Sequence, residues 1–426
     1  MNVNVRKLAL DAITKIMDKK AYSNIVINEF LNKYSLSDED RKLFTNIVYG
    51  TLQHYLTLEY YLSPYINEKK TKDWMKYLLA ICAYQVVYLD IPAYAIVNEG
   101  VNIAKMIDRY SSNFINGVLR NFLRNDLRSL DELKDDDAKY LSVKYSTPEW
   151  LVCYLLKDYD YKTLEKILEE DSIAKKDAIR VNTIKTTKED VKKDLEKLGI
   201  TYTESELSSV GFVIDKPVMN TYLFKKGLVT IQDIASQMVG LIASPKEGDS
   251  VIDLCSAPGS KTCHLSAIMN NTGKIFACDI HEHKFKLMEK NFNRLGVTNA
   301  YLQLIDARDV KKYVKKESFD LVLADVPCSG LGVIGHKVDL KYQITLDAIK
   351  EIISLQKEII ESTCSLVKPG GSYVYSTCTI NKEENEEMID AFLAKHPEFT
   401  KEKEMIILPF EYHTDGFYIA KLRKES

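Results

Sequence analysis

The spacing of apolar residues divides the chain into a helical N-terminal part and a C-terminal part in which strands and helices alternate. In residues 1–128, apolar positions recur every three or four residues, as they do in amphipathic helices. Residues 5–16 show this spacing, and residues 75–90 are apolar almost throughout, which suits the centre of a helical bundle. Ser and Asp residues precede the apolar run at 43–52 as helix caps. The pattern therefore predicts an all-helical domain over residues 1–128.

The pattern changes after a charged segment at residues 126–142, which indicates a boundary or linker. The following region combines segments with the three-to-four-residue spacing of helices and short apolar segments typical of strands. Strands are predicted at residues 178–185 and 211–217, with an amphipathic helix from residue 187 to Gly199 between them. Residues 222–244 are predicted to lead through a short turn into a further helix. This mixture predicts a small α+β domain, an RNA-binding one in our interpretation, over residues 138–226.

From residue 249 onward, short apolar segments rich in β-branched residues alternate strictly with longer amphipathic ones. Strands are predicted at residues 250–257, 274–280, 300–306, 319–325, 372–379 and 416–424. Such alternation is typical of a doubly wound, mostly parallel sheet with helices on both faces. The predicted fold class is therefore multidomain, with an all-α bundle, a small α+β domain and a Rossmann-like α/β domain over residues 227–426.

Composition narrows the class of protein. With 46% apolar residues among 426, the chain is long and apolar enough for two or three globular domains. No segment approaches the ~18 uninterrupted apolar residues of a membrane span, and the N-terminus lacks the apolar core of a signal peptide. The eight cysteines are scattered without a C-x-x-C pair. We therefore expect a cytoplasmic protein with reduced thiols, no metal site and no membrane partner.

Charge is uneven along the chain. The whole chain has a formal net charge of −3, but residues 1–130 hold 17 Lys/Arg against 13 Asp/Glu, a net of +4 (17 − 13). Arg120, Arg124 and Arg128 recur every four residues, which would place them on one helical face. Such a face is either a solvated surface or a stripe that contacts phosphates, and both interpretations stay open at this point.

The first strand of the α/β domain ends in "DLCSAPGSKT", where a nucleotide-like cofactor could bind. A P-loop aligned on Lys261 would need glycines where the chain has Cys255 and Ser260, and a dinucleotide fingerprint would need more than Gly259. S-adenosylmethionine carries no phosphate and needs only a tight turn with backbone donors and an acid for its ribose. The turn therefore favours S-adenosylmethionine over ATP or NAD.

Acidic residues end the next three predicted strands. Asp279 lies 20 residues after Gly259 (279 − 259), the spacing expected of a ribose-binding acid. Asp306 ends the third strand, where it would meet the adenine, and Asp325 ends the fourth. Because the carboxyl ends of parallel strands face one crevice, we expect these carboxylates to lie together.

Two thiols, Cys328 and Cys378, follow the ends of two predicted strands. A thiolate that adds to carbon 6 of a pyrimidine makes carbon 5 electron-rich enough to take a methyl group, and a second thiol could assist release. Asp325, three residues before Cys328 (328 − 325), could hydrogen-bond the ring nitrogen. A cysteine–histidine hydrolase is the competing thiol chemistry, but none of the seven histidines ends a predicted strand. The remaining cysteines are interpreted as small inert hydrophobes, except Cys255, which would line the cofactor turn.

The motifs "DLCSAPGSKT", "DARD", "ADVPCSGLGV" and "YSTCTINKEENE" resemble those of the Nol1/Nop2/Sun family of RNA cytosine-carbon-5 methyltransferases, and residues 1–128 resemble NusB-type RNA-binding domains. A fusion of the two is the arrangement of a bacterial small-subunit ribosomal RNA methyltransferase, which implies a cytidine of 16S ribosomal RNA as the substrate. The resemblance implies that Cys378 is the nucleophile, that Cys328 acts in release, and that Asp325 is the acid beside them. It also implies a cofactor site for S-adenosylmethionine made of Cys255, Ser256, Ala257, Pro258, Gly259, Ser260, Lys261, Asp279, Asp306 and Asp325.

Two features depart from the family pattern. Ser260 stands where a second glycine is common, and the loop "GHKVDLKY" at residues 335–342 lacks the usual basic pair followed by His-Pro-Asp. We expect this loop to meet the RNA.

The rival interpretations of the whole chain are a transfer-RNA cytosine methyltransferase and a non-catalytic RNA-binding or elongation factor. The expected partner is 16S ribosomal RNA, with the protein acting as a monomer.

Overall fold

The computed structural model describes residues 4–89 and 91–425, and the chain divides into two compact units. The first comprises Met1–Ile173 together with Ile334–Ile344, and the second comprises Ala174–Val333 and Thr345–Ser426. Residues 1–3 and 90 of the predicted helical domain, the last of which ends the predicted apolar helix, and residue 426 of the predicted catalytic domain lie outside the described residues.

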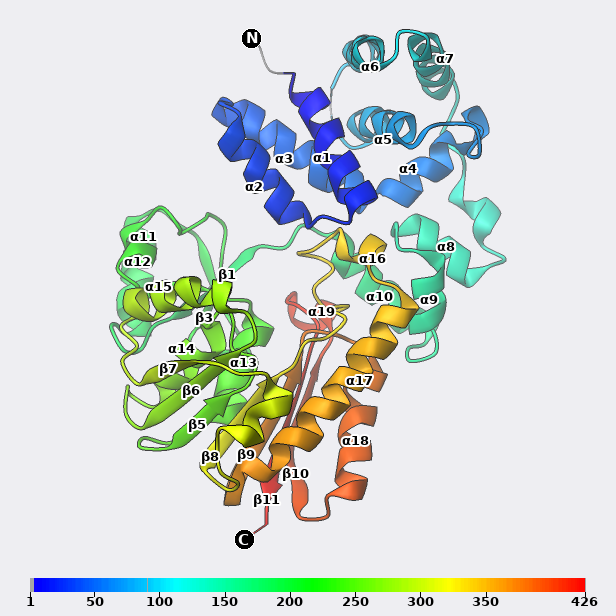
Figure 1. Ribbon diagram of the computed structural model, residues 1–426. Coiled ribbons are helices and arrows are strands. Elements are labelled where there is room, and N and C mark those ends of the chain that lie inside the picture. The colour runs from blue at the N-terminus through cyan, green and yellow to red at the C-terminus, as the bar shows by residue number, and fades with distance from the viewer. Residues whose placement is uncertain (1–3, 90, 426) are drawn as a thin grey trace. The chain divides into compact units, whose positions relative to one another are not determined.

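The first unit is helical (Figure 1). Its helices are α1 (Val5–Lys19), α2 (Ser23–Lys33), α3 (Asp38–Gln53), α4 (Tyr55–Leu62), α5 (Asp73–Val87), α6 (Ala93–Ile107), α7 (Ser111–Arg124), α8 (Asp137–Lys144), α9 (Glu149–Leu155), α10 (Tyr161–Ser172) and α16 (Leu340–Gln343). The predicted cap of α3 is confirmed, because the Ser37 side chain accepts a hydrogen bond from the Asp40 backbone N–H.

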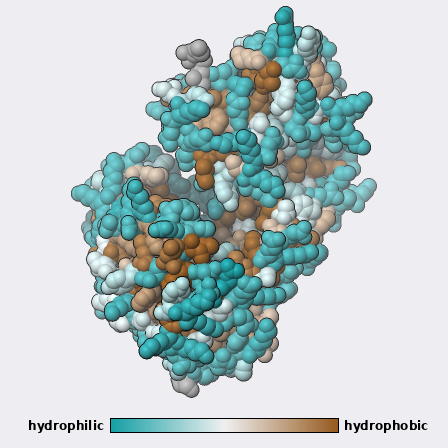
Figure 2. All heavy atoms as spheres, viewed as in Figure 1, coloured by the Kyte–Doolittle hydropathy of each residue, from teal (hydrophilic) through white to brown (hydrophobic). Residues whose placement is uncertain are grey.

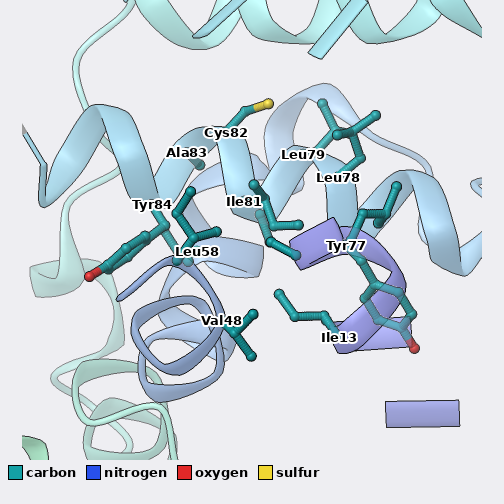
Figure 3. Close-up of a cluster of buried hydrophobic side chains, with 14 of the residues drawn as sticks. Ile13, Val48, Leu58, Tyr77, Leu78, Leu79, Ile81, Cys82, Ala83 and Tyr84 are labelled. Carbon is teal, nitrogen blue, oxygen red and sulfur yellow. The ribbon is translucent and has the colours of Figure 1, made fainter. Parts of the chain in front are cut away.

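The apolar helix α5 lies at the centre of this unit, as its sequence predicts. It contacts α1, α3, α4, α6 and α7, and its residues from Leu78 to Ala83 are almost completely buried. Side chains from three other helices, including Ile13, Val48 and Leu58, converge on it (Figure 3). A helix that is apolar on all sides requires such a position, because any exposed face would leave apolar area in water.

The loop that follows the Cys328 motif belongs to the helical unit, and our expectation that it meets RNA is wrong for its second half. Val338 joins the hydrophobic core of the unit, and the Lys341 side chain is 1% exposed. The Tyr342 hydroxyl donates to the Leu52 carbonyl at 2.7 Å, and Ser23 Oγ donates to the Asp339 carboxylate. These contacts bury Val338, Asp339 and Lys341, whereas His336 and Lys337 in the first half of the loop are exposed.

The predicted arginine stripe is also corrected. Helix α7 ends at Arg124, because Asn125 adopts extended backbone angles, so Arg128 does not continue the helical face. Arg128 instead pairs with Glu132 at 2.8 Å and lies over the Tyr60 ring at 4.4 Å. Arg120 and Arg124 remain exposed on α7.

The second unit begins with a four-stranded antiparallel sheet in the order β2-β3-β1-β4. Its elements are β1 (Asp177–Val181), α11 (Lys188–Lys197), β2 (Tyr202–Glu204), β3 (Gly211–Ile214), α12 (Tyr222–Lys225) and β4 (Val229–Ile231). The short strands β2 and β4 were not predicted, since three residues are too few to show an alternating pattern.

A seven-stranded sheet in the order β10-β11-β9-β8-β5-β6-β7 forms the rest of the unit. Its strands are β5 (Ser250–Asp253), β6 (Lys274–Asp279), β7 (Ala300–Leu304), β8 (Phe319–Asp325), β9 (Val367–Thr377), β10 (Phe399–Ile407) and β11 (Phe417–Lys424). The strands from β9 to β7 are parallel and β11 is antiparallel to β9, so the predicted mostly parallel sheet is confirmed. The prediction missed β10, whose exposed residues "TKEKE" mask any apolar alternation.

Helices cover both faces of this sheet (Figure 1). The larger ones are α13 (Ile234–Ala243), α14 (Ser260–Ile268), α15 (Phe285–Leu295), α17 (Leu346–Thr363) and α18 (Glu386–Lys395), with the short α19 at Pro409–Tyr412. Val374 of β9 packs in one cluster with α13 residues, whereas the neighbouring Tyr373 bonds through its hydroxyl to Thr363 of α17 at 2.8 Å. Adjacent residues of one strand point to opposite faces, so α13 and α17 lie on opposite sides of the sheet.

The surface is largely hydrophilic on the face that Figure 2 shows, with apolar side chains in scattered patches. Among residues 4–89 and 91–425, no helix has the length and apolar character that crossing a membrane demands.

Candidate active site

The parallel pairing of β8 with β9 brings the two predicted thiols together. Asp325, the last residue of β8, is the register partner of Ser376 in β9, so the residues that follow each strand emerge side by side. The Cys328 and Cys378 sulfur atoms lie 3.3 Å apart without a disulfide between them, and both side chains are partly exposed. The sequence places the two thiols fifty residues apart (378 − 328), and only the sheet makes them neighbours.

The surroundings of Cys328 favour its protonated form. The hydrogen bond to Cys378 and burial both raise the pKa of Cys328 well above its usual value, and nearby negative charge adds to the rise. Because a thiolate, not a thiol, is the effective nucleophile, Cys328 is suited to carry a proton.

Asp325 is held beside the thiols by two partners. Its carboxylate accepts a hydrogen bond from Ser376 Oγ at 2.8 Å and pairs with the Lys261 ammonium at 2.7 Å. Burial by itself would lower the Lys261 pKa, but the Asp325 charge and hydrogen bond outweigh it, and the pKa is raised. Lys261 also lies over the Phe417 ring at 5.3 Å, so this cation joins the cofactor turn to the acid next to the thiols.

The turn between β5 and α14 holds the predicted cofactor residues Cys255 to Gly259, and Ser260 and Lys261 begin α14. Gly259 precedes the helix with φ at +93°, a conformation that side-chain-bearing residues rarely adopt, which explains the glycine there. The Asp279 carboxylate, at the end of β6 and 7% exposed, accepts backbone hydrogen bonds from Ala257 at 3.2 Å and His281 at 2.9 Å. Each carboxylate oxygen can accept a second bond, so Asp279 both shapes the turn and can bind a hydroxyl.

Asp306 lies two residues beyond the end of β7 (306 − 304) and caps the short helix that follows. Arg308 pairs with its carboxylate at 2.7 Å, and this hydrogen bond is the main reason that the pKa of Asp306 is lowered. The carboxylate is therefore ionised and partly engaged by Arg308 at the edge of the sheet.

Asp253 is a fourth acid at a strand end that sequence reasoning missed. It ends β5, is completely buried, and accepts a hydrogen bond from Thr262 Oγ1 at 2.6 Å. Its other oxygen, Oδ1, has no hydrogen-bond partner among the described residues. Burial raises the pKa of the Asp253 carboxyl group to about 7. The strand-end rule applied to the other acids would have found it, since it opens the "DLCSAPGSKT" motif.

Most of the other cysteines are buried, as expected for residues that act as small inert hydrophobes. Cys82, Cys263, Cys278 and Cys364 are buried, and burial raises the pKa of each. Burial likewise raises the Cys255 pKa well above its usual value, consistent with a lining role. Cys153 differs because its side chain is exposed.

Comparison with known proteins identifies the family. The chain is 36% identical to the probable ribosomal RNA small subunit methyltransferase B of Bacillus subtilis (strain 168) over 444 aligned residues, covering 99% of both chains. A family model described as 16S rRNA methyltransferase RsmB/F matches residues 240–423. The chain belongs to the RsmB/F methyltransferase family. It is therefore a methyltransferase, and the predicted resemblance is confirmed.

Other matches agree with this RsmB/F assignment. The NusB family model matches residues 3–124, and the ferredoxin-like domain of RsmF/B-like methyltransferases matches residues 147–221. The probable ribosomal RNA small subunit methyltransferase B of Synechocystis sp. (strain ATCC 27184 / PCC 6803 / Kazusa) is 31% identical, covering 99% of this chain and 100% of its own. The crystal structure of PH0851 superposes with a TM-score of 0.82 at 26% identity, covering 100% of both chains. A methyltransferase homologue from Pyrococcus horikoshii has a TM-score of 0.61 at 27% identity, covering 68% of this chain and 99% of its own.

Proposed function

We propose that the protein methylates carbon 5 of a cytidine in 16S ribosomal RNA, using S-adenosylmethionine, through a covalent adduct with Cys378. The observation that carries this proposal is the pair of thiols 3.3 Å apart beside Asp325, because base methylation at a carbon atom needs a nucleophile and a means of release. Relatives that match 99% of the chain are named ribosomal RNA small subunit methyltransferases, which favours this substrate over transfer RNA.

The residues around the cofactor turn fit S-adenosylmethionine. Asp253, Asp279 and Asp325 end three neighbouring strands, β5, β6 and β8. Carboxylates suit the ribose hydroxyls and the positive charge of this cofactor, and the unpaired Oδ1 of Asp253 is a buried acceptor in the same region. When bound, S-adenosylmethionine supplies an electrophilic methyl group.

Attack by Cys378 is the first step that the chain's own residues perform. Its sulfur, after loss of the thiol proton, attacks as a thiolate and forms a bond to carbon 6 of the cytosine. The electron pair of the 5,6 double bond moves toward carbon 5, which becomes the methyl acceptor. The ring takes up a proton at the nitrogen beside the exocyclic amine. Asp325 hydrogen-bonds this side of the ring, and the Lys261 ammonium on the same carboxylate keeps a proton available there.

Release reverses the attachment. Carbon 5 loses its proton to a base, the 5,6 double bond forms again, and the Cys378 sulfur leaves. We assign Cys328 to this step, because its raised pKa keeps a proton on the sulfur 3.3 Å from Cys378, where it can stabilise the departing thiolate. The target base must be flipped out of its stack to reach both sulfurs.

Single replacements of the two cysteines test this assignment. Cys378→Ala should abolish methylation of 16S ribosomal RNA and form no adduct, because no carbon 6 bond can arise. Cys328→Ala should attack and methylate but release slowly, so a protein–RNA adduct that survives denaturing electrophoresis should accumulate.

Cys153→Ala, which removes an exposed thiol elsewhere, is the matched control and should behave as wild type. An adduct with Cys378→Ala and none with Cys328→Ala would exchange the two roles. Full turnover by both variants would exclude thiol catalysis.

A further inference from the structure

A completely buried carboxylate lies next to the two cysteines and has no role in the chemistry described above. Glu384 ends the short helix η6 (Lys382–Glu384) and is 0% exposed. Its Oε1 accepts hydrogen bonds from Ser329 Oγ at 2.5 Å and Asn381 Nδ2 at 2.9 Å. Its Oε2 accepts from the Ser329 backbone N–H and from Gln356 Nε2, both at 2.9 Å. Burying a charge is costly, and four donors are the compensation that such a group needs.

Glu384 is linked to the residues that follow the two cysteines, directly to Ser329 and through Ser329 to Thr379. Ser329 comes directly after Cys328 and Thr379 directly after Cys378, and their hydroxyl oxygens lie 2.8 Å apart. Since Ser329 Oγ donates to Glu384, it accepts from Thr379. Gln356 adds a bond to the Pro327 carbonyl at 2.9 Å, so the network holds the backbone on both sides of Cys328.

We propose that Glu384 is a positioning residue that fixes the loops carrying Cys328 and Cys378, so that both sulfur atoms face one substrate ring. This inference rests on the proposed thiol chemistry and extends it to a residue that touches neither substrate nor sulfur. The sheet brings the two loops to neighbouring strand ends, and the Gly332 backbone N–H donates to the Cys378 carbonyl at 3.1 Å. The side-chain bonds around Glu384 add to this backbone link and fix the residues directly beside the two cysteines. All four hydrogen bonds to Glu384, two of them from Ser329, are donated to its carboxylate, so a carboxylate matches this site and a carboxamide does not.

Glu384 also acts through its charge. The hydrogen bond with Cys378 and burial are the main causes of the raised Cys328 pKa, and the Glu384 charge raises it further. Other groups that interact electrostatically with the thiol pair include Lys261, which attracts Cys378, and Tyr375, whose own pKa is raised mainly by burial. Glu384 thus helps to keep Cys328 protonated for the release step.

The first test compares Glu384→Gln with Glu383→Gln, which removes the same charge from an exposed residue of the same short helix. Single-turnover methylation of 16S ribosomal RNA should slow by about tenfold or more in Glu384→Gln, because a carboxamide must turn its NH₂ group toward one of the donors. S-adenosylmethionine affinity, measured by titration calorimetry, should stay unchanged, which shows that the variant is folded. A wild-type rate in Glu384→Gln would overturn the proposal.

The second test uses a readout that a purely structural role would not move. In a Cys378→Ser background, the pH dependence of Cys328 alkylation by iodoacetamide is followed by mass spectrometry of the modified peptide. The midpoint should move to lower pH when Glu384→Gln is added and should stay in place when Glu383→Gln is added. Equal midpoints would overturn the electrostatic part of the proposal.

Ser329→Ala and Thr379→Val decide the outcome if Glu384→Gln does not fold. Each removes one hydroxyl of the network and leaves Glu384 in place. Both should slow single-turnover methylation by about tenfold, and normal rates in both would overturn the positioning role. If the wild type itself neither methylates RNA nor forms an adduct, the proposed function fails, whereas the alkylation midpoints still report on Glu384 alone.

Discussion

The buried carboxyl group of Asp253 should make the stability of the protein fall as the pH rises. Its pKa is raised to about 7, mainly by burial, whereas an aspartate in an unfolded chain has a pKa of about 3.9. Below about pH 4 the group is protonated in both the folded and the unfolded state, so its ionisation does not change the free energy of unfolding. Between these two pKa values the unfolded chain releases the proton and the folded chain retains it, so the unfolded state gains relative stability.

The size of the effect follows from the difference between the two pKa values. Each unit corresponds to about 1.36 kcal/mol, so the full difference of about three units costs about 4 kcal/mol above pH 7. Asp253→Asn has a similar shape, keeps an acceptor for Thr262 and cannot ionise. The free energy of unfolding of the wild type relative to this variant should therefore fall by about 4 kcal/mol between pH 4 and pH 8.

Urea denaturation of both proteins across this pH range measures the difference. Asp320→Asn is a control of opposite sign, because hydrogen bonds from Lys368 and the Ser250 backbone outweigh burial and lower the pKa of Asp320. Replacing Asp320 should remove stability that is present above about pH 4 and lost as the pH falls. A wild-type-minus-Asp253→Asn difference that does not change with pH would refute the raised pKa.

Two further predictions concern the cofactor and the RNA. Asp279→Ala should weaken S-adenosylmethionine binding by about tenfold or more in titration calorimetry, because a charged acceptor for a hydroxyl contributes about 1.5–3 kcal/mol; unchanged affinity would contradict its role at the ribose. Replacing Arg120 and Arg124 by Ala should weaken RNA binding and flatten its salt dependence, whereas Arg128→Ala, whose side chain is engaged by Glu132, should leave the slope unchanged. If the double replacement does not alter the salt dependence of RNA binding, Arg120 and Arg124 form a solvated surface and do not contact phosphates.

The local pattern of apolar and polar residues was enough to predict most of the helices and strands, and the positions of the acids and thiols along the chain. The apolar residues of α5 indicate a central helix, because no other position removes all of its faces from water. Strands that alternate with helices indicate a parallel sheet, and strand ends indicate where acids and thiols gather. Asp279, Cys328 and Cys378 could be selected on this basis alone.

Contacts between residues distant in the sequence decided the rest. The 3.3 Å between Cys328 and Cys378, the ion pair of Lys261 with Asp325 and the bonds around Glu384 all depend on the register of β8 with β9 and on the packing beside them. The burial of Lys341 in the helical unit is of the same kind, since a lysine in a charged loop carries no local sign that it will be enclosed. Hydrophobic periodicity reports which face of an element is buried, but not which distant side chain will meet it, and that pairing is determined only when the whole chain packs.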